Sequence, residues 1–147
     1  MQEDLLTAPP EFKLYKENAI VGATFLGGPL VAGYLAAENF RHLGQPARAR
    51  TAWMIAILST IVILGASILI PAAEKIPSIL FPLTYTFVTR FLIQTYQRDA
   101  IVSHIAQGGP TYSGWRAVWI ALVGVVVLFA IVLGILGLLD KNFLQSN

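Results

Sequence analysis

The sequence predicts an all-α fold, an integral membrane protein built as a four-helix bundle. Hydrophobic residues make up 56% of the 147 residues and charged residues only 12%, about half the share of an ordinary soluble domain. The charges are also unevenly placed, because the stretches 52–73 and 117–139 contain none. Four apolar segments reach the roughly 20 residues that a helix needs to cross the hydrocarbon core.

The first two predicted spans form an antiparallel helical hairpin. The first, residues 19–37, carries no charge, and Asn18 is suited to cap its start. The second, residues 52–73, is rich in Ile, Leu and Val. Gly44 stands at a natural left-handed C-cap position between them, and Pro46 is tolerated in the first turn of the following helix.

The last two predicted spans form a second hairpin. The third, residues 76–97, carries one charge, Arg90, and its helix can continue as far as Ile105 before Gly108-Gly109-Pro110 interrupts it. The fourth, residues 117–139, is the most apolar. The membrane domain therefore covers residues 19–139, with extramembrane tails of residues 1–18 and 140–147.

The distribution of Lys and Arg predicts the orientation of the chain. The side of the first and third connections carries six, namely Arg41, Arg48, Arg50, Arg90, Arg98 and Arg116. The opposite side carries four, namely Lys13, Lys16, Lys75 and Lys141. This bias places both termini outside the cytoplasm. The tryptophans lie near the arginine-rich side, at the depth of the lipid headgroups: Trp53, Trp115 and Trp119.

A short repeat suggests an internal duplication. His42-Leu43-Gly44-Gln45 precedes Trp53, and 62 residues later His104-Ile105-Ala106-Gln107 precedes Trp115. One interpretation is a duplicated helical hairpin, with two copies related by an axis along the membrane normal. The other is a chance match in apolar sequence of low complexity.

The first span contains a helix-breaking motif, Gly27-Gly28-Pro29. Proline removes the hydrogen bond to the carbonyl of Phe25, and the two glycines give the backbone room to bend. A broken helix can line a solute site, as in transporters. The structural alternative, which we favour, is a kink with close helix packing. The positions assigned to breaking or packing are Gly27, Gly28, Pro29, Gly33 and Gly44.

Arg90 is the single charge well inside a predicted span. At helical spacing it shares a polar stripe with Thr86, Gln94 and Gln97, and Glu38 and Asn39 are its expected partners on the first span. A charge at this depth normally faces protein or water. The stripe therefore indicates either a polar cleft between the first and third spans or an arginine that snorkels to the headgroups.

Catalysis has little support in the residues. Cysteine is absent, and His42 and His104 lack accompanying ligands at metal-binding spacing, apart from Asp99. Ser59 and Ser67 have no base within reach by sequence. Ten Lys and Arg form no run dense enough for a nucleic-acid backbone. We therefore expect no enzyme, no metal or other cofactor and no nucleic-acid partner.

Several segments together resemble a family of small bacterial inner-membrane proteins of unassigned function. They are Ala23-Thr-Phe-Leu-Gly-Gly-Pro-Leu30, Ala32-Gly33-Tyr34-Leu35, Asn39-Phe40 and Leu43-Gly44, followed by His104, Gly108-Gly109 and Ser113-x-Trp115. The resemblance covers about a third of the chain. It implies a multi-pass protein of the bacterial cytoplasmic membrane and no particular activity.

The leading functional hypothesis is a non-catalytic membrane protein, an accessory or scaffold subunit or a binder of a lipid or a partner protein. Its expected partners are the lipid bilayer and either further copies of itself or another membrane protein. The alternative is a small oligomeric transporter or channel that uses the Gly27-Gly28-Pro29 break and the Arg90 stripe.

Overall fold

The described part of the chain is almost entirely helical, which confirms the all-α prediction. A computed structural model describes residues 8–70, 72 and 75–145. Its helices are α2 (Glu17–His42), α3 (Pro46–Leu69), α4 (Leu80–Tyr96), α5 (Arg98–Ala106) and α6 (Gly114–Gln145). The first seven residues of the predicted N-terminal tail lie outside the described residues.

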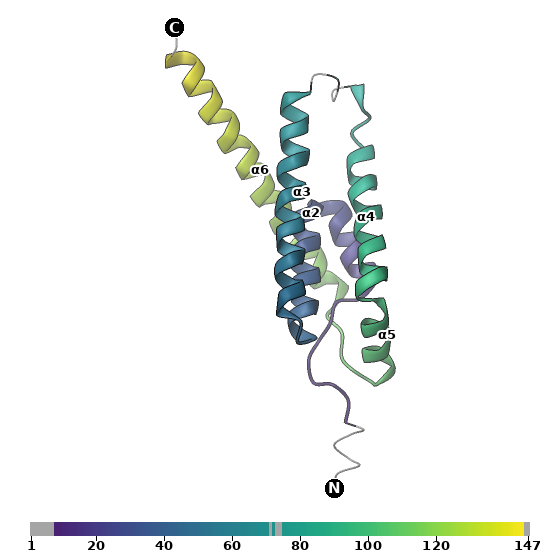
Figure 1. Cartoon of the computed structure of the whole chain (residues 1–147). Coiled ribbons are helices and arrows are strands. Elements are labelled where there is room, and N and C mark those ends of the chain that lie inside the picture. The colour runs from purple at the N-terminus through teal and green to yellow at the C-terminus, as the bar shows by residue number, and fades with distance from the viewer. Residues whose placement is uncertain (1–7, 71, 73–74, 146–147) are drawn as a thin grey trace.

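Helix α2 folds back on itself at Gly28. This residue has φ 76° and ψ −170°, outside the helical region, and Pro29 follows it. The backbone N–H of Tyr15 donates to Oδ1 of Asn39 (2.8 Å), and Nδ2 of Asn39 donates to the carbonyl of Tyr15 (2.9 Å). A straight helix of 26 residues would separate its ends by about 39 Å. Helix α2 is therefore a short hairpin with both ends at one end of the molecule (Figure 1).

The fold-back differs from the single first span expected over residues 19–37. Three helices are long and apolar enough to cross a membrane: Glu17–His42, Pro46–Leu69 and Gly114–Lys141. The two arms of α2, residues 17–27 and 29–42, are however only about 16 and 21 Å long, too short for a hydrocarbon core of about 30 Å. We call the α2 end of the molecule, where α3 and α6 begin and α4 ends, the hairpin end.

Three long helices surround the hairpin, in place of the expected bundle of four straight spans. Helix α3 leaves the hairpin end, α4 returns to it, and α6 leaves it again (Figure 1). The described chain thus passes between the two ends an odd number of times. Residues 8–16 lie at the hairpin end and the C-terminal part of α6 at the other, an arrangement that differs from the expected one, in which both tails share one side.

The hairpin holds the other helices together. Helix α2 packs against α3, α4 and α6, whereas these three have no extensive contact with one another in the described residues. Glycines allow the close approach. A Cβ on Gly27 would lie 3.0 Å from the backbone of Ala121 in α6, and one on Gly33 would overlap the side chain of Ala56 in α3. The core consequently runs along α2.

The turn after α2 has the geometry expected for its residues. Gly44 has φ 70°, and its N–H donates to the carbonyl of Arg41 (3.0 Å). The N–H of Gln45 donates to the carbonyl of Phe40 (2.8 Å), which completes a Schellman motif. Pro46 then begins α3.

The N-terminal arm closes the hairpin end. Tyr112 N–H donates to the carbonyl of Leu14 (2.9 Å), and the guanidinium Nε of Arg116 donates to the hydroxyl of Tyr15 (2.8 Å). Burial raises the pKa of Tyr15, so its phenol stays neutral at physiological pH. The imidazole of His104 is 2.8 Å from the carbonyl of Pro110. The first two contacts hold Leu14 and Tyr15 against the segment that leads into α6.

The halves of the proposed duplication fold differently. A duplicated hairpin would give the first and third spans the same shape, and the Pro-Leu pair that occurs in both, Pro29-Leu30 and Pro82-Leu83, would lie at equivalent places. Pro29 instead lies at the tip of a hairpin, whereas Pro82 lies in the first turn of the single rod α4. Helix α4 ends at Tyr96, and a separate short helix, α5, continues to Ala106. The structure therefore gives the duplication no support.

Candidate functional site

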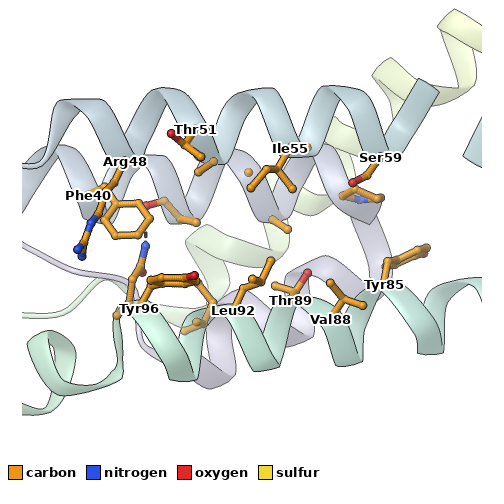
Figure 2. A pocket seen from close by; sticks show the side chains of 18 residues that line it. Phe40, Arg48, Thr51, Ile55, Ser59, Tyr85, Val88, Thr89, Leu92 and Tyr96 are labelled. Carbon is orange, nitrogen blue, oxygen red and sulfur yellow. Dashed lines mark hydrogen bonds between the residues drawn. The ribbon is translucent and has the colours of Figure 1, made fainter. Parts of the chain in front are cut away.

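A groove with a volume of about 340 Å³ lies between α3 and α4. This is within the usual range of ligand pockets. Its floor is the second arm of α2, and Figure 2 shows side chains of α3 and α4 facing each other across it. The lining comprises Pro29, Ala32, Gly33, Ala36, Phe40, Arg48, Thr51, Ala52, Ile55, Ala56, Ser59, Tyr85, Val88, Thr89, Leu92, Ile93, Tyr96 and Gln97.

Small residues and a short hairpin create this space. Ala32 and Ala36 are buried on the floor, where larger side chains would fill the groove. The walls are held apart because α3 and α4 both pack on α2 rather than on each other. At the outer edge, Ile55 and Val88 are about half exposed. The groove therefore opens sideways, between the two helices.

Among the lining residues, the charged one, Arg48, lies at the hairpin end. Figure 2 shows Arg48 and Tyr96 at one end, Ser59 and Tyr85 at the other end, and apolar side chains together with Thr51 and Thr89 between them. Arg48 is exposed in the first turn of α3, and its Nη1 donates to Oε1 of Gln45 (3.2 Å). No carboxylate of the described residues lies within 4.0 Å of its guanidinium nitrogens. The groove is thus apolar with one cationic end.

A buried hydrogen-bond network supports the floor at that end. Gln97 is 1% exposed, and its Nε2 donates to the carbonyl of Ala36 (2.9 Å). Nδ2 of Asn39, which is fully buried, donates to Oε1 of Gln97 (3.2 Å) as well as to the carbonyl of Tyr15. Two side chains thereby tie the N-terminal arm, the second arm of α2 and the end of α4 together.

The predicted polar stripe is divided between different partners. Nε of Arg90 lies 3.7 Å from Oε1 of Glu17, which also accepts a hydrogen bond from Nε2 of Gln94 (2.8 Å). Glu38, an expected partner of Arg90, instead lies 3.4 Å from Arg41. Thr86 Oγ1 is buried without a hydrogen-bond partner among the described residues. The fold-back of α2 explains why Arg90 pairs with Glu17 and not with Glu38, because it brings Glu17 to the depth where a straight helix would place Glu38.

The backbone carbonyl that the helix break leaves free accepts a hydrogen bond from a side chain. Pro29 leaves the carbonyl of Phe25 without its helical donor, and the hydroxyl of Tyr85 donates to that carbonyl (3.4 Å). A Cβ on Gly28 would meet nothing within 4 Å, so its positive φ rather than crowding calls for glycine. In the structure the break turns the chain and packs it.

Sequence reasoning did not find the groove. It assigned Arg48 only a topological charge, and it gave Tyr85 and Tyr96 no role. The two tyrosines face α3 because packing on the α2 hairpin fixes how α3 and α4 are rotated about their own axes. The spacing of apolar residues along the sequence does not show this rotation. Gly27-Gly28-Pro29 at the centre of α2 was the available signal, since it divides one span into two arms of 10–14 residues, the length typical of re-entrant segments.

The two histidines lie near one another without forming a metal centre. The ring of Phe12 lies between them, 4.8 Å from His104 and 6.3 Å from His42 by ring centroids. Within residues 8–70, 72 and 75–145, no group of three or more His, Cys, Asp or Glu could hold a metal ion.

Comparison of the chain with protein-family models, with curated proteins and with solved structures finds no match. The resemblance to small inner-membrane proteins therefore stays a prediction, and function has to be argued from the residues themselves.

Proposed function

We propose that this chain is a non-catalytic integral membrane protein that binds the acyl chain of a membrane lipid in the groove between α3 and α4. The observation that carries the proposal is an apolar groove that opens sideways between two helices with exposed apolar surfaces. A groove with that opening is accessible from a surrounding bilayer rather than from water.

The exposed surface supports a membrane environment. Side chains that would be buried in a soluble protein are exposed along two helices, including Leu58 (63%) and Ile61 (61%) on α3 and Val126 (68%) on α6. The most apolar window of α6 has a mean hydropathy of 3.1 and no buried residue. Continuous apolar surface of this extent marks contact with lipid or another protein. A bacterial cytoplasmic membrane is the location that the resemblance implies.

The fold-back also changes the proposed orientation. With residues 8–16 at the hairpin end, Lys13 and Lys16 join the six arginines there, and only Lys75 and Lys141 remain at the other end. A bias of six to four thus becomes eight to two. By the positive-inside rule the hairpin end is cytoplasmic. The N-terminus is then inside and the C-terminus outside, in contrast to the sequence-based expectation.

The groove matches one leaflet of a bilayer in length. Arg48 and Ser59 mark its two ends on α3 and are separated by eleven residues, or about 16 Å of helix. This is close to half of a hydrocarbon core of about 30 Å. Exposed Trp115 and Trp119 at the start of α6 support a headgroup level near the Arg48 end. An acyl chain would therefore extend from the headgroup region to the hairpin tip.

Two contacts weigh against the transport alternative. The freed carbonyl at the Gly27-Gly28-Pro29 break accepts a hydrogen bond from Tyr85, so it is not available to a solute. Arg90, the other element of that hypothesis, is paired with Glu17. A role as an accessory subunit or homo-oligomer remains compatible with lipid binding, because α6 is free to contact another protein.

A photo-crosslinking experiment tests acyl-chain binding. The purified protein is reconstituted with a phospholipid that carries a diazirine in its acyl chain, irradiated and digested, and the labelled peptides are identified. We expect labelling of peptides from α3 and α4 that line the groove, saturable by unlabelled lipid. Ile55→Trp would fill the groove and reduce saturable labelling at least fivefold.

Ile57→Trp is the matched control. Ile55 and Ile57 lie two residues apart on α3 and are both 46% exposed, but only Ile55 lines the groove. Ile57→Trp should leave saturable labelling unchanged. Equal labelling of both variants, or labelling that no excess of lipid reduces, would show that the groove is not a binding site.

A further inference from the structure

We infer that the lipid held in the groove carries a net negative phosphate headgroup, which Arg48 recognises in the cytoplasmic leaflet. This inference rests on the proposed acyl-chain site and adds the headgroup class. Arg48 is the one charged residue among those lining the groove, and it lies at the end nearest the headgroup level.

The surroundings of Arg48 leave its charge uncompensated. No carboxylate of the described residues lies within 4.0 Å of its guanidinium nitrogens, and two that lie at the hairpin end have other partners: Glu38 lies 3.4 Å from Arg41, and Glu17 accepts from Gln94 and pairs with Arg90. The hydrogen bond from Arg48 to Gln45 uses one guanidinium nitrogen and a neutral acceptor. A guanidinium offers five donors in a planar fork that matches a phosphate. Arg48 therefore retains donors for an anion at the mouth of the groove.

The position of Arg48 along α3 adds to the preference of this end of the groove for a negatively charged group. Arg48 lies in the first turn of the helix, whose N-terminal end carries a partial positive charge. Eight of the ten Lys and Arg of the chain lie at this end of the molecule. Their summed field attracts the anionic lipids of the cytoplasmic leaflet. Arg48 differs from the neighbouring arginines because it lines the groove, so a headgroup bound there can keep its acyl chain in the groove between α3 and α4.

Neutral and charged lipids with identical acyl chains can separate the headgroup from the chain. Native mass spectrometry of the detergent-solubilised protein would be titrated with phosphatidylglycerol, which is anionic, phosphatidylcholine, which is zwitterionic, and diacylglycerol, which lacks phosphate. We expect phosphatidylglycerol to bind about fivefold more tightly than phosphatidylcholine, the size of one arginine contact with an anionic lipid. Diacylglycerol should bind most weakly.

Arg48→Gln should reduce the preference for phosphatidylglycerol to less than twofold, and Arg48→Lys should retain most of it. Arg50→Gln is the matched control, because Arg50 is an exposed arginine of the same helix that does not line the groove. Its preference should stay within twofold of the wild-type value. The change lies on an exposed side chain, so folding is expected to be unaffected, and the unfolding midpoint verifies this.

The outcomes separate the headgroup inference from the acyl-chain proposal. If all three lipids bind equally and Ile55→Trp weakens all of them, the chain site stands and recognition by Arg48 is wrong. If Arg50→Gln lowers the preference as much as Arg48→Gln, a diffuse surface charge explains it and the inference is likewise wrong. If no lipid binds in a manner that Ile55→Trp weakens, the acyl-chain proposal itself fails.

Discussion

Helices α2 and α6 were both expected to be apolar spans, yet the first is largely buried in the fold and the second is largely exposed. Over half of the most apolar window of α2 is buried (56%), whereas none of the corresponding window of α6 is. Helix α2 is folded in two at the centre of the molecule, and α6 extends away from it as a continuous rod (Figure 1). Length and hydropathy alone therefore do not distinguish a re-entrant hairpin from a span.

Residue type explains the difference better than hydropathy does. Of 26 residues in α2, nine are Gly or Ala and six are Val, Ile or Leu; of 32 in α6, seven are Gly or Ala and sixteen are Val, Ile or Leu. Small residues allow close backbone contact, which in lipid takes over part of the role of hydrophobic burial in water. Large branched residues instead cover α6, whose most apolar window is not buried in the structure.

The largest test of this contrast exchanges glycine for leucine in each helix. Gly27→Leu would drive a side chain into the backbone of Ala121, and we expect a loss of about 3 kcal/mol or of the folded state. Gly137→Leu is the control, because a Cβ there meets nothing within 4 Å. Thermal unfolding in detergent measures both. Equal loss from both changes would contradict the packing of α2 on α6.

A second test concerns the polar tie across the hairpin. Asn39→Ala leaves the backbone N–H and carbonyl of Tyr15 and the amide oxygen of Gln97 without their partner, and we expect a cost of about 2–3 kcal/mol. Asn18 does not cap α2 as the sequence suggested, because the helix begins at Glu17, after Lys16 at the N-cap. Asn18→Ala therefore removes an exposed asparagine inside the same helix and should cost about 0.5 kcal/mol or less. Unfolding in a denaturing detergent titration compares them. A small effect of Asn39→Ala would mean that packing alone closes the hairpin.

The smallest expected effect isolates backbone conformation from packing. Gly22 and Gly28 both have open space where the methyl group of an alanine would project, but only Gly28 has positive φ. Gly28→Ala should therefore destabilise by about 1–3 kcal/mol. Gly22→Ala should be neutral or stabilise by up to about 1 kcal/mol, because it raises helix propensity. If the two variants unfold at the same temperature, the turn at Gly28 is not the one described.

The sequence was sufficient for the local features and insufficient for the long-range ones. The all-α class, the Gly-Gly-Pro break and the turn from Gly44 to Pro46 follow from backbone chemistry, which acts over a few residues. The angle of the break does not, because it depends on Asn39 meeting Tyr15 and on Gly27 meeting Ala121. Arg90 was consequently assigned to Glu38 rather than Glu17. The groove was missed for the same reason.

The position of the N-terminal arm relative to the turn after α2 tests the central claim most directly. The chain has no cysteine, so single cysteines can be introduced at exposed Ala8, Ala47, Ser78 and Lys141 and labelled with a membrane-impermeant maleimide in sealed vesicles of each orientation. A re-entrant α2 places Ala8→Cys on the same side as Ala47→Cys, with Ser78→Cys and Lys141→Cys on the other. Labelling of Ala8→Cys together with Ser78→Cys, opposite Ala47→Cys, would show that α2 crosses the membrane and would contradict the account.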